Sequence, residues 1–579
     1  MASVSKLFEQ ANKAQQQGLV TEAVEGYRKV LKKKPNHGDA HYLLGTLLAT
    51  QGQRKQALLH LQRASRLLPA SPMVKTNLGL LLKMQDQPDT AEKAFRAALR
   101  IQPHQPEALN NLSALMITKG HPVEAEALAR QCIVMGGEHA RYGYIQCGNA
   151  VADQGRSDEA IELLHQALSY DRSNQAAWDN YLTLLSYSTQ FDSEAIYQAH
   201  RRWAQQFEQP VPAKPAAVKG VIKIGYLSPD FTEHPVGKLM EPLLAHHDSE
   251  QFEIYLYHDS QRSDDLTARL KALGHHWRDV AAMDNTACQG LIADDGIHIL
   301  IDLAGHSANN RLPMFAMRAA PIQVSYLGYS STTGLENIDY AISDEMFDPI
   351  DPANENAFYS EKLLRLKRIA FAFMPASVAP PVNQDKQAGF TLGSFNTLRK
   401  IGADVIALWA EMLKKIPNSR LLLQTRGLDE PAMAEQLTAQ FVALGVESTQ
   451  LELHGFSDYQ SHLALVAKCD LTLDPWPWNG HMTTLNTLWM GVPMLTLKTD
   501  RRSGRMGAAI LQSLEMEYFI AESPQQYLEK ALELSKEPEK LTTVRQTLRQ
   551  RMTDSALVDG KGLAIAMEQA FCTMLKSNP

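Results

Sequence analysis

Residues 479–493, NGHMTTLNTLWMGVP, combine residue types that suit the binding of an anion. A glycine precedes a histidine and two threonines, and the stretch continues with apolar residues at helical spacing. The first turn of a helix carries unpaired N–H groups and the positive end of the helix dipole, so it attracts phosphate groups. Gly480 would let a ligand approach the backbone, and His481, Thr483 and Thr484 would add donors. The alternative is an ordinary capped helix whose threonines bond only to their own backbone.

A pyrophosphate at this position needs positive charge, and Lys400 is the best candidate to supply it. This lysine ends the segment GFTLGSFNTLRK, in which polar residues follow a strand-like run. The sequence has no GxxxxGK[ST] loop, no GxGxxG after the first strand of either half, and no Asp-x-Asp pair that would hold a divalent metal. We therefore expect protein groups, Lys400 foremost, to neutralise bound phosphates.

From residue 221 onward, short apolar runs alternate with stretches of helical periodicity. The runs are VIKIGYL, FEIYLYH, IHILIDLAG, IQVSYLGY, GFTLGSF, RLLLQTR, LELHGF, DLTLDP and VPMLTL. Strands alternating with helices predict mostly parallel sheets that are covered on both faces. The region is too long for one such core, and the proline-containing residues 374–389 form a natural break. We predict two Rossmann-like lobes, at residues 219–380 and 381–579.

Polar residues follow several of these runs, where parallel sheets bind their ligands. Asp230 and His234 come after VIKIGYL, and His306 and Asn309 come after IHILIDLAG. Each of them alone also fits a solvated loop or a helix cap. Their joint occurrence at strand ends of both lobes indicates a binding site between the lobes.

The first third of the chain has an internal period of 34 residues. The period relates the alanines Ala23, Ala57, Ala91 and Ala125, and the prolines Pro35, Pro69 and Pro103. Small residues let two helices approach closely, and proline ends the second helix of each pair. This is the tetratricopeptide pattern, and it predicts a right-handed superhelix over residues 1–172. Residues 173–218 read as a degenerate helix pair followed by a linker. An array made only of repeats would be a general protein-binding scaffold.

Composition limits the remaining function classes. The net charge of −7 gives no general attraction to nucleic acid, which we therefore do not expect as a partner. The five cysteines are widely spaced and form no metal-binding pattern, so we expect no metal and read them as free thiols. The N-terminal residues lack the apolar core of a signal peptide, and no run reaches the ~18 apolar residues of a membrane span. We expect a cytoplasmic protein without a membrane partner.

Five features together resemble the O-linked N-acetylglucosamine transferases, including their bacterial members and the plant SPINDLY type. They are the repeats and the segments IGYLSPDFTEHPVGKLM, FAMRAAPIQVSYLGYSSTTGLENIDY, GSFNTLRKI and NGHMTTLNTLWMGVPMLTL. The resemblance covers nearly the whole chain. It implies a GT-B glycosyltransferase that moves N-acetylglucosamine from UDP-N-acetylglucosamine to Ser or Thr of polypeptides, inverting and independent of metal or other cofactors. Polypeptide acceptors would pass along the repeats.

The resemblance also assigns roles to individual residues. The implied catalytic residues are His234, Lys400 and Asp230, with Lys400 on the donor pyrophosphate and His234 near the acceptor. His462 would pack against the uridine, Leu327 and Gly328 would line the sugar pocket, and the helix start would lie beneath the phosphates. The implied nucleotide-sugar-binding residues are His462, Asn479, Gly480, His481, Met482, Thr483, Asn486, Leu327 and Gly328.

Three positions depart from the family pattern. Asn486 stands where the ribose-binding residue is usually acidic, AAWDNYL lacks a histidine that some members carry after the repeats, and Ser330 to Thr332 replace a PGT turn. These changes leave two alternatives: a transferase with another donor sugar, such as glucose or fucose, or a weakly active scaffold that binds nucleotide sugars. The general base, the acceptors and self-association stay open.

Overall fold

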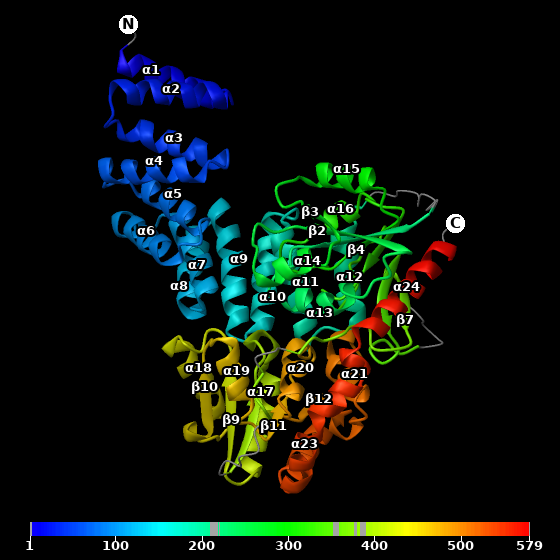
Figure 1. The fold of residues 1–579 in the computed structure, drawn as a ribbon. Coiled ribbons are helices and arrows are strands. Elements are labelled where there is room, and N and C mark those ends of the chain that lie inside the picture. Colours follow the sequence, from blue (N-terminus) through cyan, green and yellow to red (C-terminus); the bar gives the residue numbers. More distant parts are fainter. Residues whose placement is uncertain are drawn as a thin grey trace. The chain divides into compact units, whose positions relative to one another are not determined.

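The structure of the 579-residue chain is a computed structural model that describes residues 3–208, 218, 220–350, 358–375, 379–382 and 389–577. The chain divides into two compact units, Met1–Val151 with His165–Asp171, and Ala152–Leu164 with Arg172–Pro579 (Figure 1). Most of the predicted linker and of the proline-containing break lies outside the described residues.

Paired helices build the first unit. They are α1 (Val4–Gln16), α2 (Val20–Lys33), α3 (Gly38–Thr50), α4 (Arg54–Leu67), α5 (Pro72–Lys83), α6 (Pro88–Ile101), α7 (Pro106–Lys119), α8 (Pro122–Met135), α9 (Gly137–Asp153) and α10 (Ser157–Tyr170), the last two of which contribute residues to both units. The four periodic alanines are fully buried, and the prolines predicted to end helices follow α2, α4 and α6 by two residues. The predicted repeat array is therefore confirmed.

The second unit begins with a helix pair and a first lobe. The helices are α11 (Gln175–Tyr187), α12 (Ser193–Ala204), α13 (Pro235–Leu244), α14 (Asp265–Ala272), α15 (Asn285–Asp295) and α16 (Leu312–Phe315). The strands are β1 (Ile222–Ser228), β2 (Phe252–His258), β3 (His276–Asp279), β4 (Ile299–Asp302), β5 (Ile322–Ser325), β6 (Tyr340–Asp344) and β7 (Lys362–Leu366). They form one parallel sheet in the order β3-β2-β1-β4-β5-β6-β7.

The second lobe repeats this plan. Its strands are β8 (Phe390–Ser394), β9 (Ser419–Gln424), β10 (Leu451–His454), β11 (Leu471–Leu473), β12 (Met494–Leu497) and β13 (Ile520–Ala521). Its helices are α17 (Ala403–Lys415), α18 (Pro431–Ala443), α19 (Tyr459–Val466), α20 (Met482–Trp489), α21 (Met506–Gln512), α22 (Pro524–Leu534), α23 (Pro538–Asp554) and α24 (Gly560–Ser577). The sheet is parallel in the order β10-β9-β8-β11-β12-β13. The predicted double Rossmann-like fold is confirmed.

Both sheets reverse their strand order beside the first strand of the lobe. In the first lobe the reversal lies between β1 and β4, and in the second it lies between β8 and β11. In each lobe, the loops that follow the two strands at the reversal run in opposite directions. They leave a crevice at the carboxyl edge of the sheet, where open α/β sheets bind ligands. The residues that follow β1, β4, β8 and β11 are those that the sequence singled out.

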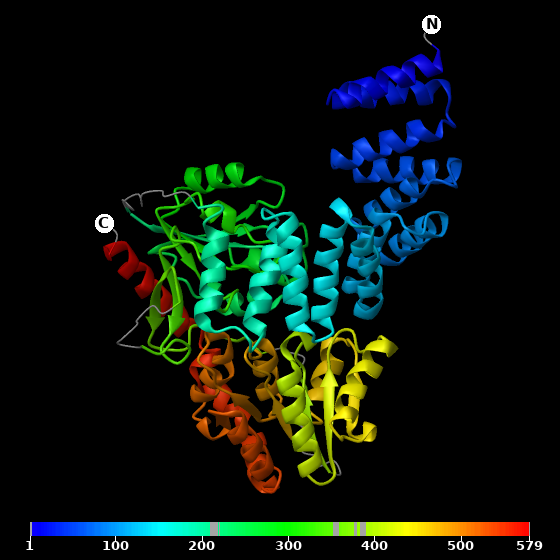
Figure 2. The ribbon, with the colours of Figure 1, turned by 180° about the vertical axis from the view of Figure 1, so that it is seen from behind.

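Two segments pack on the first lobe although other parts of the chain separate them from it. The last helix, α24, contributes Leu563, Met567 and Phe571 to the core of the first sheet. Figures 1 and 2 show it in red beside the green first lobe. A boundary at residue 380 thus groups α24 with the second lobe, whereas its apolar face lies in the first. On α12, Trp203 is fully buried and its ring meets that of His306 edge-on.

Four strands were not among the predicted runs: β3, β6, β7 and β13. β3, His276–Asp279, is an edge strand with no buried residue, so it has no apolar run to reveal it. β6, Tyr340–Asp344, is fully buried but ends in Ser343 and Asp344. The Asp344 carboxylate accepts the backbone N–H groups of Met346 and Phe347, so a polar residue is satisfied inside the core.

Candidate active site

Lys400 and the start of α20 meet at the reversal point of the second sheet. Lys400 follows β8, and residues 474–481 connect β11 to α20. The ammonium Nζ of Lys400 donates to the backbone carbonyl of Asn479 at 2.7 Å. Burial lowers the pKa of Lys400 to about 8, against the opposing charge of Asp474. A bound anion would therefore contact an ammonium group that is fixed in position and whose positive charge is only partly neutralised by the protein.

Donors around this ammonium lack partners among the described atoms. The imidazole Nε2 of His481 and the hydroxyl of Thr484 are buried without a hydrogen bond. Burial, and to a smaller extent the charge of Lys400, lowers the pKa of His481 to about 3, so the ring is neutral at pH 7. A buried polar group without a partner costs free energy, and a phosphate oxygen or a water that reaches these atoms satisfies them.

Asp474 fixes the turn before α20, and the sequence reasoning did not assign it a role. Its fully buried carboxylate accepts the N–H of Gly480 at 2.7 Å and the hydroxyl of Thr496 at 2.8 Å. A Cβ at Gly480 would lie 3.0 Å from the Thr484 hydroxyl and 3.1 Å from Asn396 Oδ1, tighter than most contacts. A side chain at position 480 would therefore have to displace its neighbours, and the approach of a ligand to the Gly480 backbone stays a prediction. Met482 and Thr483 form the first turn of α20.

His462 and Asn486 lie in one cluster that Tyr459 joins. The Tyr459 hydroxyl donates to Asn486 Oδ1 at 2.8 Å, and its ring stacks on His462 with centroids 6.3 Å apart. His462 Nδ1 lies 2.8 Å from Gln424 Oε1 at the end of β9, and burial lowers the pKa of His462. The side-chain oxygen of Asn486 therefore already accepts a hydrogen bond from within the protein. Its donor, Tyr459, was not among the residues predicted from the sequence.

Asp230 and His234 follow β1 in the first lobe and contact each other. His234 caps α13 by accepting the N–H of Val236, and its Nδ1 lies 3.5 Å from Asp230 Oδ2. Burial lowers the pKa of His234 and raises that of Asp230. The described residues show no hydrogen bond or ion pair between these two side chains and Lys400. On α13, Lys238 lies 5.0 Å from the ring centre of Tyr459, which brings this helix to the His462 cluster.

Leu327 and Gly328 occupy the turn after β5. Leu327 has a φ of +66°, and a Cβ at Gly328 would overlap the carbonyl oxygen of Leu303, so only glycine fits there. The next residue, Tyr329, has its ring 6.3 Å from that of Trp478, which in turn lies 6.0 Å from Lys400 Nζ. Trp478, unassigned from the sequence, thus lies near both Tyr329 and Lys400.

Comparisons with known proteins identify the family of the chain. The profile of glycosyl transferase family 41 matches residues 200–376 and 386–567, and a tetratricopeptide repeat profile matches residues 8–72. The chain is 32% identical over 427 residues to a probable UDP-N-acetylglucosamine–peptide N-acetylglucosaminyltransferase SPINDLY of Oryza sativa subsp. japonica. That match covers 72% of this chain and 46% of the relative, so the chain spans about half the length of the curated relatives it matches.

Two further comparisons extend the likeness. The probable N-acetylglucosaminyltransferase SEC of Arabidopsis thaliana is 31% identical over 61% of this chain and 37% of its own length. The solved structure of a lysine-to-methionine mutant of the Thermobaculum terrenum O-GlcNAc transferase superimposes with a TM-score of 0.83 at 30% identity, over 88% of this chain and 98% of that one. Sequence profile, relatives and fold therefore agree that this chain belongs to glycosyltransferase family 41.

Proposed function

We propose that this protein transfers N-acetylglucosamine from UDP-N-acetylglucosamine to serine or threonine hydroxyls of polypeptides, with inversion at the anomeric carbon and without a metal ion. The observation that carries the proposal is the group of unsatisfied donors around Lys400, at the reversal point of the second sheet. Membership of family 41 supports the class of reaction.

In this proposal the second lobe holds the donor. The pyrophosphate binds Lys400 Nζ, the N–H groups of the first turn of α20 and the Thr484 hydroxyl, and the uridine lies by His462 and Tyr459. Asn486 donates through its amide nitrogen or shares its oxygen with the ribose, since its oxygen already accepts from Tyr459. A lysine and helix amides can neutralise the phosphates, so no metal is required.

The chemical step needs stabilisation of a leaving diphosphate and an oriented hydroxyl. As the acceptor oxygen attacks the anomeric carbon in line, negative charge grows on UDP, and Lys400 with the α20 amides stabilises it. His234 is neutral at pH 7 because burial lowers its pKa. Its Nδ1 accepts the N–H of Val236, so Nε2 carries the ring proton and can donate a hydrogen bond to an oxygen of the acceptor or the phosphate. Asp230 Oδ2 lies 3.5 Å from Nδ1 of His234, so a carboxyl stands beside the ring.

The acceptor and the compartment complete the proposal. The repeats of the first unit offer a surface for extended polypeptides, as repeat superhelices commonly do. Among the described residues, no helix has both the length and the apolar character to cross a membrane. The five cysteines are free, which fits a reducing, cytoplasmic setting.

Turnover of a donor panel tests the proposal. The full-length protein should release UDP from UDP-N-acetylglucosamine faster with an acceptor protein than without, and mass spectrometry should find N-acetylhexosamine on serine or threonine. Activity that survives chelation of divalent metals is expected. Binding of UDP without sugar transfer to any polypeptide would instead point to a nucleotide-sugar-binding scaffold.

A different donor sugar is the second candidate, and one observation favours testing it. The Ser330 to Thr332 turn is held by Thr332, whose hydroxyl donates to the buried Glu361 at 2.6 Å. Only Tyr329 separates this turn from Leu327 and Gly328, which would line the sugar pocket. UDP-glucose and GDP-fucose therefore belong in the same panel, and faster turnover of either would reassign the sugar while keeping the transferase.

A further inference from the structure

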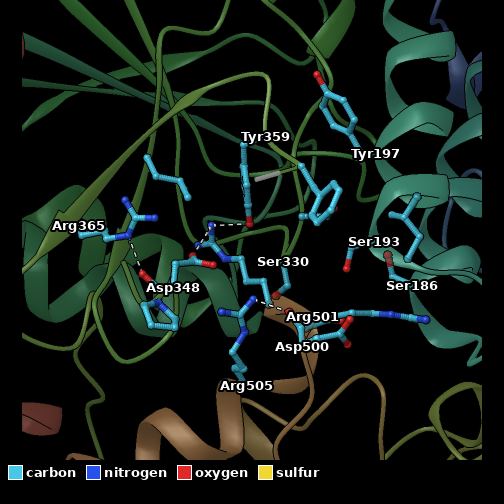
Figure 3. Close-up of a pocket in the computed structure, with 17 residues that line it drawn as sticks. Ser186, Ser193, Tyr197, Ser330, Asp348, Tyr359, Arg365, Asp500, Arg501 and Arg505 are labelled. Carbon is cyan, nitrogen blue, oxygen red and sulfur yellow. Dashed lines mark hydrogen bonds and ion pairs between the residues drawn. The ribbon is translucent and has the colours of Figure 1, made fainter. Parts of the chain in front are cut away.

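A cavity of about 270 Å³ lies in the second unit, outside the group of residues around Lys400. Figure 3 shows that its walls come from three parts of the chain: the α11 and α12 region with Ser186 and Ser193, the first lobe with Tyr359, and the second lobe with Arg501 and Arg505. We call it the arginine pocket because its lining includes Arg365, Arg501, Arg502 and Arg505.

The lining of the arginine pocket carries more positive than negative charge. Its four arginines face two aspartates, Asp348 and Asp500. Asp348 is paired already, because its carboxylate lies 3.3 Å from Arg502 Nη1 and accepts the Ser343 hydroxyl. Arginine stays protonated in proteins, so the cavity keeps a net positive charge.

Neutral groups rather than carboxylates hold two of these guanidiniums in place. Arg501 donates to the backbone carbonyls of Ser188 and Phe191, and Arg505 Nη2 donates to the backbone carbonyl of Asp500 at 2.7 Å. Carbonyls fix the orientation of a guanidinium without neutralising its charge. The described residues show no ion pair for Arg501 or Arg505.

Two guanidinium nitrogens in the lining are buried without a hydrogen-bond partner among the described atoms. Arg502 Nε and Arg505 Nε are buried and form no hydrogen bond among the described atoms. The Arg502 side chain is only 10% exposed, and its Nη1 also donates to the Tyr359 hydroxyl at 3.1 Å. A buried polar atom without a partner calls for a water or an ion, and guanidiniums bind oxyanions through charge-assisted hydrogen bonds.

The remaining lining suits an organic group attached to that anion. Ser186, Ser193 and Ser330 provide hydroxyls, and Ile196 and Phe358 provide apolar surface. The volume is slightly below the ~300 Å³ at which pockets for drug-sized ligands begin. The pocket therefore admits one small group rather than a whole nucleotide sugar.

We propose that the arginine pocket binds a phosphate monoester, carried either by a small metabolite or by a phosphorylated side chain of a polypeptide. Arg502 and Arg505 contact the phosphate, Arg365 and Arg501 add to the positive field, and the serine hydroxyls receive the organic part. The site is separate from the predicted pyrophosphate site but joined to it, because the Ser503 carbonyl accepts the N–H of Asn479 at 2.8 Å.

Calorimetric titration of the full-length protein tests this inference. The probes are inorganic phosphate, glucose 6-phosphate and a phosphoserine peptide with its unphosphorylated form, each at ionic strength matched with chloride. All titrations are repeated on Lys400→Ala, which removes the lysine of the other anion site. The pocket variants are Arg505→Gln and Ser330→Asp, and Arg551→Gln, at an exposed position on α23, removes one positive charge elsewhere.

We expect one equivalent of phosphate monoester to bind wild type, Lys400→Ala and Arg551→Gln alike. Arg505→Gln should weaken binding by about tenfold or more, since a charge-assisted hydrogen bond is lost. Ser330→Asp should do so by repulsion without touching an arginine, which guards against a folding defect in the first variant.

Three results would overturn the inference: no binding beyond the chloride control, binding unchanged in both pocket variants, or binding lost in Lys400→Ala. Preference for glucose 6-phosphate identifies a metabolite as the source of the phosphate, and preference for the phosphopeptide identifies a modified polypeptide.

Discussion

Lys400 is the residue on which donor binding depends most directly. Replacing it by methionine keeps the length of the side chain and removes the charge. We expect UDP binding to be lost and kcat/KM to fall by roughly 10²–10³, the usual loss for one group that stabilises transition-state charge. Calorimetry with UDP and a UDP-release assay measure the two effects.

The same substitution should leave the fold intact. A charge whose pKa is lowered by burial destabilises the folded protein, so Lys400→Met should keep or raise the melting temperature. Lys415→Met, on the exposed end of α17, removes an ion pair to Glu411 and serves as the matched control with normal UDP binding. Equal loss of UDP binding in both variants would contradict the role given to Lys400.

Titration of Lys400 should make donor affinity depend on pH. Below its pKa of about 8 the lysine is charged and attracts the diphosphate, and above it the charge is lost. Burial raises the pKa of Asp474, whose ionisation adds negative charge and acts in the same direction. UDP affinity should therefore fall as the pH rises through about 8, with proton uptake on binding near that pH.

Calorimetry in buffers of different ionisation enthalpy measures this uptake. Lys400→Arg keeps its charge throughout, so its uptake should be smaller, with only the part due to Asp474 remaining. Stability depends on pH in the opposite direction to UDP affinity. Between pH 8 and 10.5 the lysine of the unfolded chain holds a proton that the folded chain releases, so the contribution of Lys400 to the free energy of unfolding rises with pH. UDP affinity that is flat from pH 6 to 9 would rule out this titration.

At the level of elements, α24 decides whether the first lobe is complete. Phe571 is fully buried in that lobe's core, whereas Ile565 on the same helix is 48% exposed. Phe571→Ala should destabilise the second unit by about 3–5 kcal/mol, because it leaves a cavity between α24 and the sheet. Ile565→Ala should change little, and thermal unfolding of both variants measures the difference. Equal effects would mean that α24 does not hold the core as described.

At the level of the whole molecule, the two units have separate cores and should unfold separately. A Cβ at Gly79 would lie 2.6 Å from the ring of Phe95, so Gly79→Val forces α5 away from α6. Overpacking of this kind costs roughly 1–3 kcal/mol. Scanning calorimetry should show that Gly79→Val lowers the melting temperature of the first unit. UDP should raise the melting temperature of the second unit alone, because it binds only there.

Leu59→Ala, at a position 68% exposed on α4, is the control and should leave both transitions unchanged. Donor binding should be normal in both variants, because every residue assigned to the donor lies in the second unit. A single transition that moves as a whole would show that the units unfold together.

Periodicity and local chemistry made much of this protein readable from its sequence. The 34-residue step of the alanines predicted the buried positions of the repeats, since identical helix pairs need the same small residue at the same contact. Continuous apolar runs predicted the central strands, because strands covered on both faces bury every side chain. Gly480 and Lys400 were predicted because an anion site needs close backbone approach and a cation, and the structure places the Lys400 ammonium on the carbonyl of Asn479, next to Gly480.

Only the tertiary structure decided what depends on contacts between distant segments. It placed α24 in the core of the first lobe, bonded Tyr459 to Asn486 across 27 residues, and set Asp474 beneath Gly480. It also collected arginines from both lobes into one pocket. No local pattern encodes these pairings, because a side chain's partner is set by how the sheets and helices pack, whereas the period of a helix or strand is set by its own backbone geometry.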